Sequence, residues 1–144
     1  MLRDDQQPQA RSATWSCTVC HEVAATVTLL PARARDRGVA EGAAARGPHP
    51  ADVMADMDRL AIVGGPVSVT LGEGLDLTAI ADALDRWDVR ALHGLDPEFA
   101  PFWCPECDAC YCGVHYLHWD VWDGDFFDCV RGRCPRGHER MLMD

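Results

Sequence analysis

Eight cysteine and histidine residues stand in four short pairs whose spacing is typical of metal ligands. The pairs are Cys17 with Cys20, Cys104 with Cys107, Cys112 with His115, and Cys134 with His138. A tight turn between the two members of a pair lets both side chains reach one ion at ~2.0–2.3 Å. Four such pairs in one short chain are a strong signal, because a single pair is weak evidence by itself. Eight ligands suffice for two tetrahedral ions, so the sequence predicts two bound Zn2+ ions.

The residues between the third and fourth pairs suggest which pairs share an ion. Residues 116–122 and 126–131 alternate like strands and flank the turn Asp123-Gly124-Asp125, which predicts a hairpin. A knuckle at 104–107, this hairpin and a last helical turn beginning near Cys134 would make a treble-clef-like unit. The ligands that we assign to site 2 on this basis are Cys104, Cys107, Cys134 and His138. The remaining ligands, Cys17, Cys20, Cys112 and His115, then form site 1.

Two cysteines and two histidines near the pairs are left over by this assignment. Cys110 lies between two pairs and could replace a neighbour as a ligand, and Cys129 lies in the predicted hairpin. The plainer interpretation of both is a small buried residue. His21 and His118 could also substitute for a ligand, although a surface or cross-strand position suits His118 better.

The ligand pattern resembles that of a known group of zinc domains. The run Cys104-x2-Cys107-x4-Cys112-x2-His115 is similar to the central ligand run of FYVE zinc fingers, and the order of the four pairs resembles the FYVE/RING/PHD cross-brace group. The resemblance implies a cross-brace (treble-clef) metal architecture in which alternate pairs share an ion. It does not imply lipid binding, because the flank 100–104 lacks the basic patch of FYVE domains. The second pair also differs from the ligand pair usual in RING domains.

A zinc ion held by three thiolates and one imidazole has no open position for a reacting molecule. Such an ion cannot activate water, and its binding energy contributes to folding. The sequence therefore predicts two structural zinc sites and no catalytic residue at either of them.

Composition limits the classes of partner. The chain has 144 residues and a formal net charge of -10, which disfavours nucleic acid and anionic lipid surfaces. All thirteen basic residues are arginine, a usage that indicates a GC-rich bacterial genome. No apolar run approaches the ~20 residues of a membrane span. The first residues lack the apolar stretch of a secretory signal, so we expect a cytoplasmic protein.

The wider pattern predicts an α+β fold in which a small treble-clef/cross-brace zinc domain carries a helix–strand–helix insertion. Helical spacing marks residues 50–63, alternation marks 67–71, and Asp76 is placed to cap a helix that continues to Trp87, with a further turn at 89–93. The predicted segments are a disordered lead (1–14), the first zinc knuckle and strand (15–30), a flexible loop (31–49), the insertion (50–95) and the zinc-binding unit (96–144).

The favoured function is a zinc-stabilised protein-interaction or adaptor module. Residues 96–128 contain eight acidic residues and no arginine, with aromatic residues interleaved among them. These aromatic residues are Trp103, Trp119, Trp122, Phe126 and Phe127. If some of them are exposed on the hairpin, they form an acidic-rimmed patch suited to a protein partner or a basic peptide. The alternative is that all of them fill the core around a small sheet.

Two further functions remain open. Cys107 and Cys110 have the spacing of a thiol redox pair, and a hydrolase would have acid/base or nucleophilic candidates in the hairpin. Those candidates are His118, Asp120, Asp123 and Cys129. A RING-like adaptor of the ubiquitin-ligase type is a special case of the interaction module.

Overall fold

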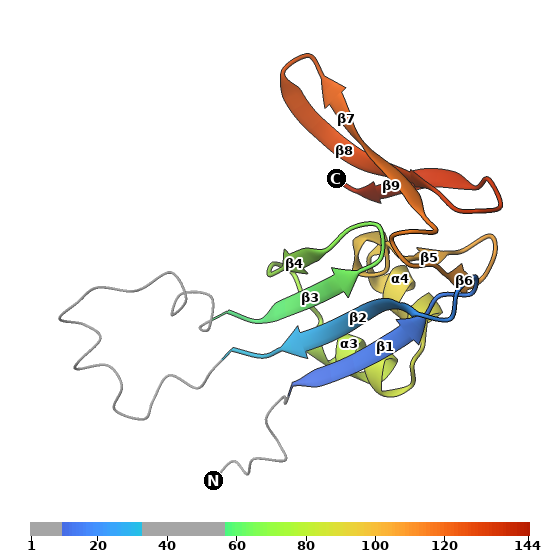
Figure 1. The fold of residues 1–144 in the computed structure, drawn as a ribbon. Coiled ribbons are helices and arrows are strands. Elements are labelled where there is room, and N and C mark those ends of the chain that lie inside the picture. The colour runs from blue at the N-terminus through green and yellow to red at the C-terminus, as the bar shows by residue number, and fades with distance from the viewer. Residues whose placement is uncertain (1–9, 33–56) are drawn as a thin grey trace, which may run out of the picture.

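The computed structural model describes residues 10–32 and 57–144, which form three antiparallel sheets and two short helices (Figure 1). The α+β class expected from the sequence is therefore found. The expected loop at 31–49 and the first part of the expected helix lie almost entirely outside the described residues. So do residues 1–9 of the expected disordered lead.

A four-stranded sheet forms the base of the molecule. Its strands are β1 (Arg11–Ser16), β2 (Val23–Leu30), β3 (Arg59–Gly64) and β4 (Val69–Leu71), in the order β1-β2-β3-β4. Alternate side chains give the sheet two different faces. Ala13, Val27 and Ile62 lie opposite one another and are buried. On the other face Ser12 and Thr28 pair their hydroxyl groups at 3.1 Å, and Thr14 and Thr26 do so at 3.0 Å.

Two of these strands correct the sequence-based expectation. Residues 11–14 belong to β1 and not to a disordered lead, because β2 supplies the partner for their backbone groups. Residues 59–63 belong to β3 and not to a helix, because β2 and β4 pair with this segment on either side. Leu60 and Ile62 alternate with less buried neighbours, as a strand requires. Pairing with a distant segment orders residues 11–14, and it overrides the local helical spacing of residues 59–63.

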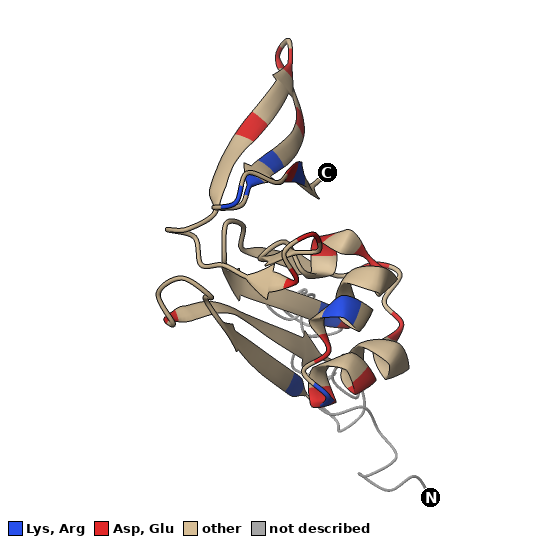
Figure 2. Ribbon diagram, turned by 90° about the vertical axis from the view of Figure 1, so that its right-hand side faces the viewer, with Lys and Arg blue, Asp and Glu red and all other residues tan. Residues whose placement is uncertain are grey.

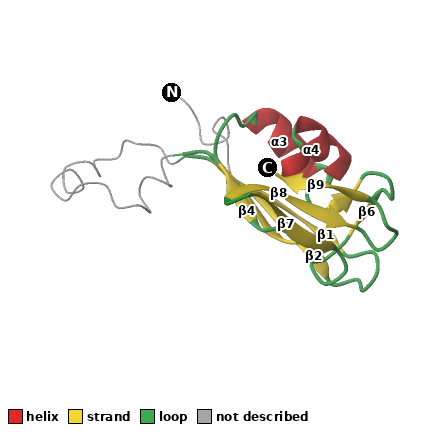
Figure 3. Cartoon of the chain, turned by 90° about the horizontal axis from the view of Figure 1, so that it is seen from above, coloured by secondary structure: helices red, strands yellow, loops and turns green. Residues whose placement is uncertain are grey.

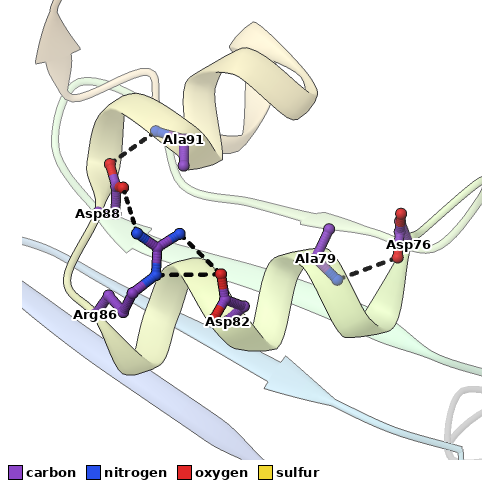
Figure 4. A network of polar contacts seen from close by, with 6 residues as sticks. All are labelled: Asp76, Ala79, Asp82, Arg86, Asp88 and Ala91. Atoms are coloured by element: carbon purple, nitrogen blue, oxygen red, sulfur yellow. Dashed lines mark hydrogen bonds and ion pairs between the residues drawn. The ribbon is translucent and has the colours of Figure 1, made fainter.

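Two helices, α3 (Leu77–Asp85) and α4 (Val89–Leu95), cover the buried face of this sheet (Figure 3). Asp76 caps α3 as expected by accepting from Ala79 N at 3.1 Å, and Asp88 caps α4 by accepting from Ala91 N at 2.9 Å (Figure 4). Arg86 links the two helices, since its guanidinium donates to both Asp82 and Asp88. The short 3-10 helix η2 (Pro97–Phe99) follows.

Details of the helices differ from the expectation. Trp87 was expected on the apolar stripe of the first helix, but it lies beyond α3 with a φ of 49° and is more than half exposed. Its indole N–H donates to Thr14 O at 3.2 Å, which attaches this turn to β1. Residues 89–93 were expected to form a single turn that ends at Gly94. They belong to a separate helix, α4, which has its own N-terminal cap at Asp88 and continues through Gly94 to Leu95, because Gly94 does not adopt a left-handed conformation.

The C-terminal half contains two smaller sheets. β5 (Trp103–Cys104) pairs with β6 (Ala109–Cys110), while β7 (Leu117–Asp123), β8 (Phe126–Arg133) and β9 (Glu139–Met143) form a three-stranded sheet in that order. The β7–β8 hairpin is as expected and rises away from the rest of the molecule (Figure 1). The last helical turn of the expected treble clef is absent from the described chain, because residues 139–143 pair with β8 as a strand.

One hydrophobic core runs from β1 to β9. Arg140 fastens the three-stranded sheet to the body: its guanidinium donates to Tyr116 Oη at 3.2 Å, to the carbonyl oxygens of Ala100 and Pro101 at 3.3 Å each, and to that of Trp103. Gly132 must be a glycine, since an added Cβ would lie 2.9 Å from the buried Tyr116 ring.

Candidate metal centres

Cluster 1 brings together Cys17, Cys20, Cys112 and His115. The loop between β1 and β2 supplies the first two. It is closed by hydrogen bonds from Cys17 N to Glu22 O at 2.7 Å and from His21 N to Cys17 O at 2.9 Å. A hydrogen bond from Thr18 N to Cys110 O at 2.9 Å holds this loop against β6, just before the second ligand pair.

The second half of cluster 1 is a turn that packs tightly against the four-stranded sheet. His115 N donates to Cys112 O at 3.0 Å, which brings the two side chains onto the same side. Gly113 lies inside this turn, and a Cβ there would be only 2.6 Å from Gly65 O. Glycine is thus required by space, because the turn approaches the backbone between β3 and β4.

Cluster 2 brings together Cys104, Cys107, Cys134 and His138. β5 and the turn to β6 supply the first pair, with Asp108 in the left-handed region at a φ of 51°. The loop between β8 and β9 supplies the second pair. Hydrogen bonds between Cys134 N and His138 O at 3.0 Å and between Gly137 N and Cys134 O at 2.9 Å close this loop. Gly137 has a φ of 93°, a conformation that favours glycine.

The distances between donor atoms fit a tetrahedral ion. Zinc–sulfur bonds of ~2.3 Å at tetrahedral angles place two sulfur atoms ~3.8 Å apart and a sulfur and a nitrogen ~3.5 Å apart. Sγ of Cys20 lies 3.8 Å from Sγ of Cys112, and Sγ of Cys107 lies 3.7 Å from Sγ of Cys134. All four donor atoms of each cluster lie within 4.8 Å of one another. Each cluster could therefore hold one metal ion.

The imidazole nitrogens fit the same geometry. His115 Nδ1 lies 3.2 Å from Cys112 Sγ and 3.8 Å from Cys17 Sγ. In cluster 2, His138 Nδ1 lies 3.1–3.5 Å from the three sulfur atoms. Both histidines thus present Nδ1 to the sulfurs, which leaves Nε2 on the outer side.

The sulfur atoms are too far apart for disulfides. A disulfide needs ~2.05 Å between sulfurs, and all eight cysteines, which lie in the described part of the chain, are free. The separations near 3.8 Å therefore match sulfurs arranged around a common centre and not sulfurs bonded to each other.

Backbone N–H groups prepare one cysteine of each cluster to be a thiolate. Burial opposes ionisation of Cys17, but hydrogen bonds from backbone N–H groups of Cys112, Cys20 and Val19 outweigh it and lower its pKa to about 6. Burial likewise opposes ionisation of Cys134, and N–H groups of His138 and Arg136 contribute most to lowering its pKa to about 7. Thiolate is the form that binds metal.

Burial dominates at Cys104. It raises the pKa of Cys104 to about 11, despite backbone N–H groups that point at this sulfur. Three anionic sulfurs cannot share such a small space without a cation, so deprotonation of the whole set requires one.

Glu106 is a functional candidate that the sequence reasoning missed. Its Oε2 lies 3.2 Å from His138 Nε2, on the side of the ring away from the sulfurs. A carboxylate in this position fixes the tautomer that leaves Nδ1 free to bind metal. Its place between the ligands Cys104 and Cys107 was the available signal, since residues inside a knuckle lie close to the ion.

The leftover residues take no part in either cluster. Cys110 is buried behind cluster 1, and burial raises its pKa to about 12. Cys129 is buried on β8, and the exposed His118 lies on the neighbouring strand β7. His21 is exposed, with a φ of 66° beside cluster 1. The structure thus supports the simpler interpretation of the two extra cysteines.

The fold and the two clusters define a small α+β domain with two sites, each formed by three cysteines and one histidine, that could bind metal. The chain belongs to the family described as a domain of unknown function (DUF8328), whose model matches residues 7–144. No curated protein and no solved structure matches the chain. Within the described residues, the helices are too short to cross a membrane.

Proposed function

We propose that this chain is a protein-interaction module that two structural zinc ions hold in shape. The observation that carries the proposal is the pair of complete donor sets, each with three sulfurs and one imidazole nitrogen at the spacings of a tetrahedral ion. Thiolate and imidazole ligands in this geometry suit zinc, and a zinc ion with four protein ligands has no vacant position. Free thiols suit a reducing compartment, so the proposal assigns the protein to the cytoplasm.

The β7–β8 hairpin supports the interaction role. Phe126 and Trp122 at its tip are 78% and 58% exposed, and Phe127 packs edge-on against Trp122 with ring centroids 5.7 Å apart. By contrast, Trp103 is buried in the core. Large exposed aromatic side chains are costly on a surface that has no partner and are enriched at protein interfaces.

The enzymatic alternative has weaker support. A redox pair formed by Cys107 and Cys110 needs both sulfurs close together and one of them as a thiolate. Cys107 lies in cluster 2 beside Cys134, and burial keeps the pKa of Cys110 near 12. No specific observation favours the hydrolase alternative, since Asp120 and Asp123 lie exposed along the projecting strand β7.

Metal analysis combined with a thiol count tests the proposal. We expect the purified native chain to contain two zinc ions. A thiol reagent should find the six ligand cysteines protected by the ions, and Cys110 and Cys129 should react slowly because they are buried. A strong chelator should release the ions and expose the six thiols together with a loss of near-ultraviolet circular dichroism.

Two results would contradict the proposal. A well-folded chain that carries neither zinc nor another metal would show that the clusters are only packed thiols. A single rapidly reacting cysteine in the zinc-loaded protein would favour the redox alternative, since structural thiolates are shielded by the ion.

A further inference from the structure

Strand β7 has an unpaired backbone edge. The three-stranded sheet has the order β7-β8-β9, and within residues 10–32 and 57–144 strand β7 pairs with β8 alone. Its side chains are exposed or half-buried along its whole length, so no other element in the described part of the chain covers it. A free edge of seven residues spans ~20–24 Å and offers a row of N–H and C=O groups to a further strand.

The edge is acidic toward the tip of the hairpin. Asp120 and Asp123 lie on β7, and Asp125 and Asp128 follow in the turn and on β8. In the described part of the chain, no arginine or histidine nitrogen lies within 4 Å of these four carboxylates. Figure 2 shows acidic residues at the far end of the hairpin and arginines toward its base. The four charges are therefore available to a cationic partner.

Apolar surface lies at both ends of the same edge. At its base, a groove of about 280 Å³ is lined by Val114, Leu117 and Pro135, and His115 and Cys134 contribute one ligand of each cluster to its walls. Gly137 and Arg133 complete the lining, and the guanidinium of Arg133 is paired with Glu139 at 3.0 Å. At its tip lie the exposed aromatic side chains already described. The groove can take an apolar side chain, and aromatic faces attract the cationic groups of Lys and Arg.

From these observations we infer that the outer edge of β7 binds an extended, Lys- or Arg-bearing segment of a partner protein as an additional strand. The inference rests on the proposed function and names the chemistry of its partner. Backbone hydrogen bonds along β7 supply affinity, and the groove and the carboxylates of Asp120 and Asp123 select the segment. The two clusters hold the base of the groove in place, which connects the metal sites to recognition.

Charge disfavours two competing occupants. If β7 of a second copy paired antiparallel with this edge about its central residue, Asp120 would face Asp120 of that copy and repel it. Nucleic acid meets the same difficulty, because its phosphates approach four carboxylates and a chain with a net charge of -10. A basic extended segment is the occupant that complements both the charge and the free backbone.

A synthetic peptide tests this inference on the full, zinc-loaded chain. The probe is a fluorescein-labelled peptide of about nine residues in which Lys alternates with Val, long enough to span β7. We expect saturable one-to-one binding measured by fluorescence anisotropy. Binding should weaken as ionic strength rises, because the charges are exposed to screening. Amide hydrogen exchange should slow in β7 on binding and remain unchanged in β9.

Matched variants distinguish binding at the edge of β7 from a general attraction between a basic peptide and an acidic protein. The Asp120→Asn/Asp123→Asn variant should weaken binding about tenfold, as expected for the loss of two exposed charge contacts. The Glu22→Gln/Glu73→Gln variant loses the same charge from exposed positions elsewhere and should change affinity by less than about twofold. A peptide with Glu in place of Lys should not bind. A peptide N-methylated along one edge should also fail to bind, since it cannot donate to β7.

Several outcomes would overturn the inference. Equal affinity of the two double variants, equal binding of the N-methylated peptide, or protection of β9 in place of β7 would each show that β7 is not the docking edge. Self-association through β7 would make a second copy the occupant. A zinc-loaded chain that does not bind the peptide refutes only this inference, whereas a folded chain without metal refutes the proposed function and the inference with it.

Discussion

Each of the two clusters has three cysteine sulfurs and one histidine nitrogen, but the two join different parts of the chain. Cluster 1 connects the loop after β1 to the turn after β6, with Cys17 and His115 separated by 98 residues. Cluster 2 connects the β5–β6 turn to the loop between β8 and β9, with Cys104 and His138 separated by 34 residues. The first cluster closes most of the described fold, whereas the second attaches the three-stranded sheet to the body.

The residues that surround the two clusters also differ. Cluster 1 is pressed against the four-stranded sheet through the contact between Gly113 and Gly65. The ligands of cluster 2 are buried to the same degree, but Glu106 lies beside the outer nitrogen of His138, whose side chain is 31% exposed. The two clusters have the same types of donor in different surroundings, so we expect the loss of an ion from each to destabilise different parts of the fold.

The largest difference should appear when one ligand of each cluster is removed. Cys17→Ser and Cys134→Ser should each leave one zinc ion per chain. Cys134→Ser should free residues 117–144 while the helices and the four-stranded sheet persist, and Cys17→Ser should destabilise the whole described fold. Loop closure alone makes the free energy of unfolding about 1 kcal/mol lower for Cys17→Ser, because its cluster closes the longer loop.

Hydrogen exchange and denaturant unfolding of both variants measure this difference. A Cys110→Ser control should keep both ions, since Cys110 belongs to neither cluster. If Cys134→Ser retained two ions and full stability, the assignment of ligands to cluster 2 would be wrong.

Arg140 provides the next test, because it attaches the C-terminal sheet without metal. Arg140→Ala should lower the free energy of unfolding by about 2 kcal/mol, since Tyr116 Oη and the carbonyl oxygens of Ala100 and Pro101 lose their donor. Chemical denaturation measures it. The exposed Arg136 is a matched control, and its replacement by alanine should have almost no effect. Equal effects of the two changes would show that the sheet is held by zinc alone.

The two ligand-loop glycines should respond differently to alanine. Gly113→Ala should cost about 1–3 kcal/mol, because its Cβ would meet Gly65 O at 2.6 Å and shift the ligands of cluster 1. Gly137→Ala meets no atom within 4 Å and should cost about 1 kcal/mol through its φ of 93° alone. Thermal unfolding of the zinc-loaded variants measures both losses of stability. A larger loss for Gly137→Ala than for Gly113→Ala would contradict this prediction.

The last expected effect concerns Glu106 and changes the affinity for metal at one cluster only. Glu106→Ala should weaken metal binding at cluster 2 about tenfold, because His138 loses the carboxylate that orients its ring. Competition with a chromophoric chelator measures the affinity of each site. The affinity of cluster 1 should not change, which provides an internal control. A change at both sites would show that the effect is not carried by His138.

The sequence predicted correctly those features that depend only on residues close together in the chain. The turn at Asp123-Gly124-Asp125 and the cap at Asp76 depend on neighbouring residues, and the structure contains the hairpin and the cap. The grouping of alternate pairs also corresponds to the two clusters. Metal ligation itself remains a prediction.

The sequence-based predictions were wrong where a segment's structure depends on a partner strand that is distant in the sequence. Residues 59–63 carry apolar side chains compatible with a helix, but β2 and β4 offer them backbone partners on both sides. Residues 139–143 follow a ligand loop that a treble clef would continue as a helix, yet β8 pairs with them instead. Strand formation depends on a partner that local spacing does not reveal.

The amino-acid sequence by itself determined the chemistry of this protein: which side chains can bind metal, how they are paired, and how acidic the surface is. Only the tertiary structure decided that each ligand set converges to tetrahedral spacing and that Glu106 lies beside the outer nitrogen of His138. It also decided that one edge of β7 has no partner strand among residues 10–32 and 57–144. Donor type and charge are properties of single residues, whereas convergence, orientation and exposure depend on how segments distant in the chain pack together.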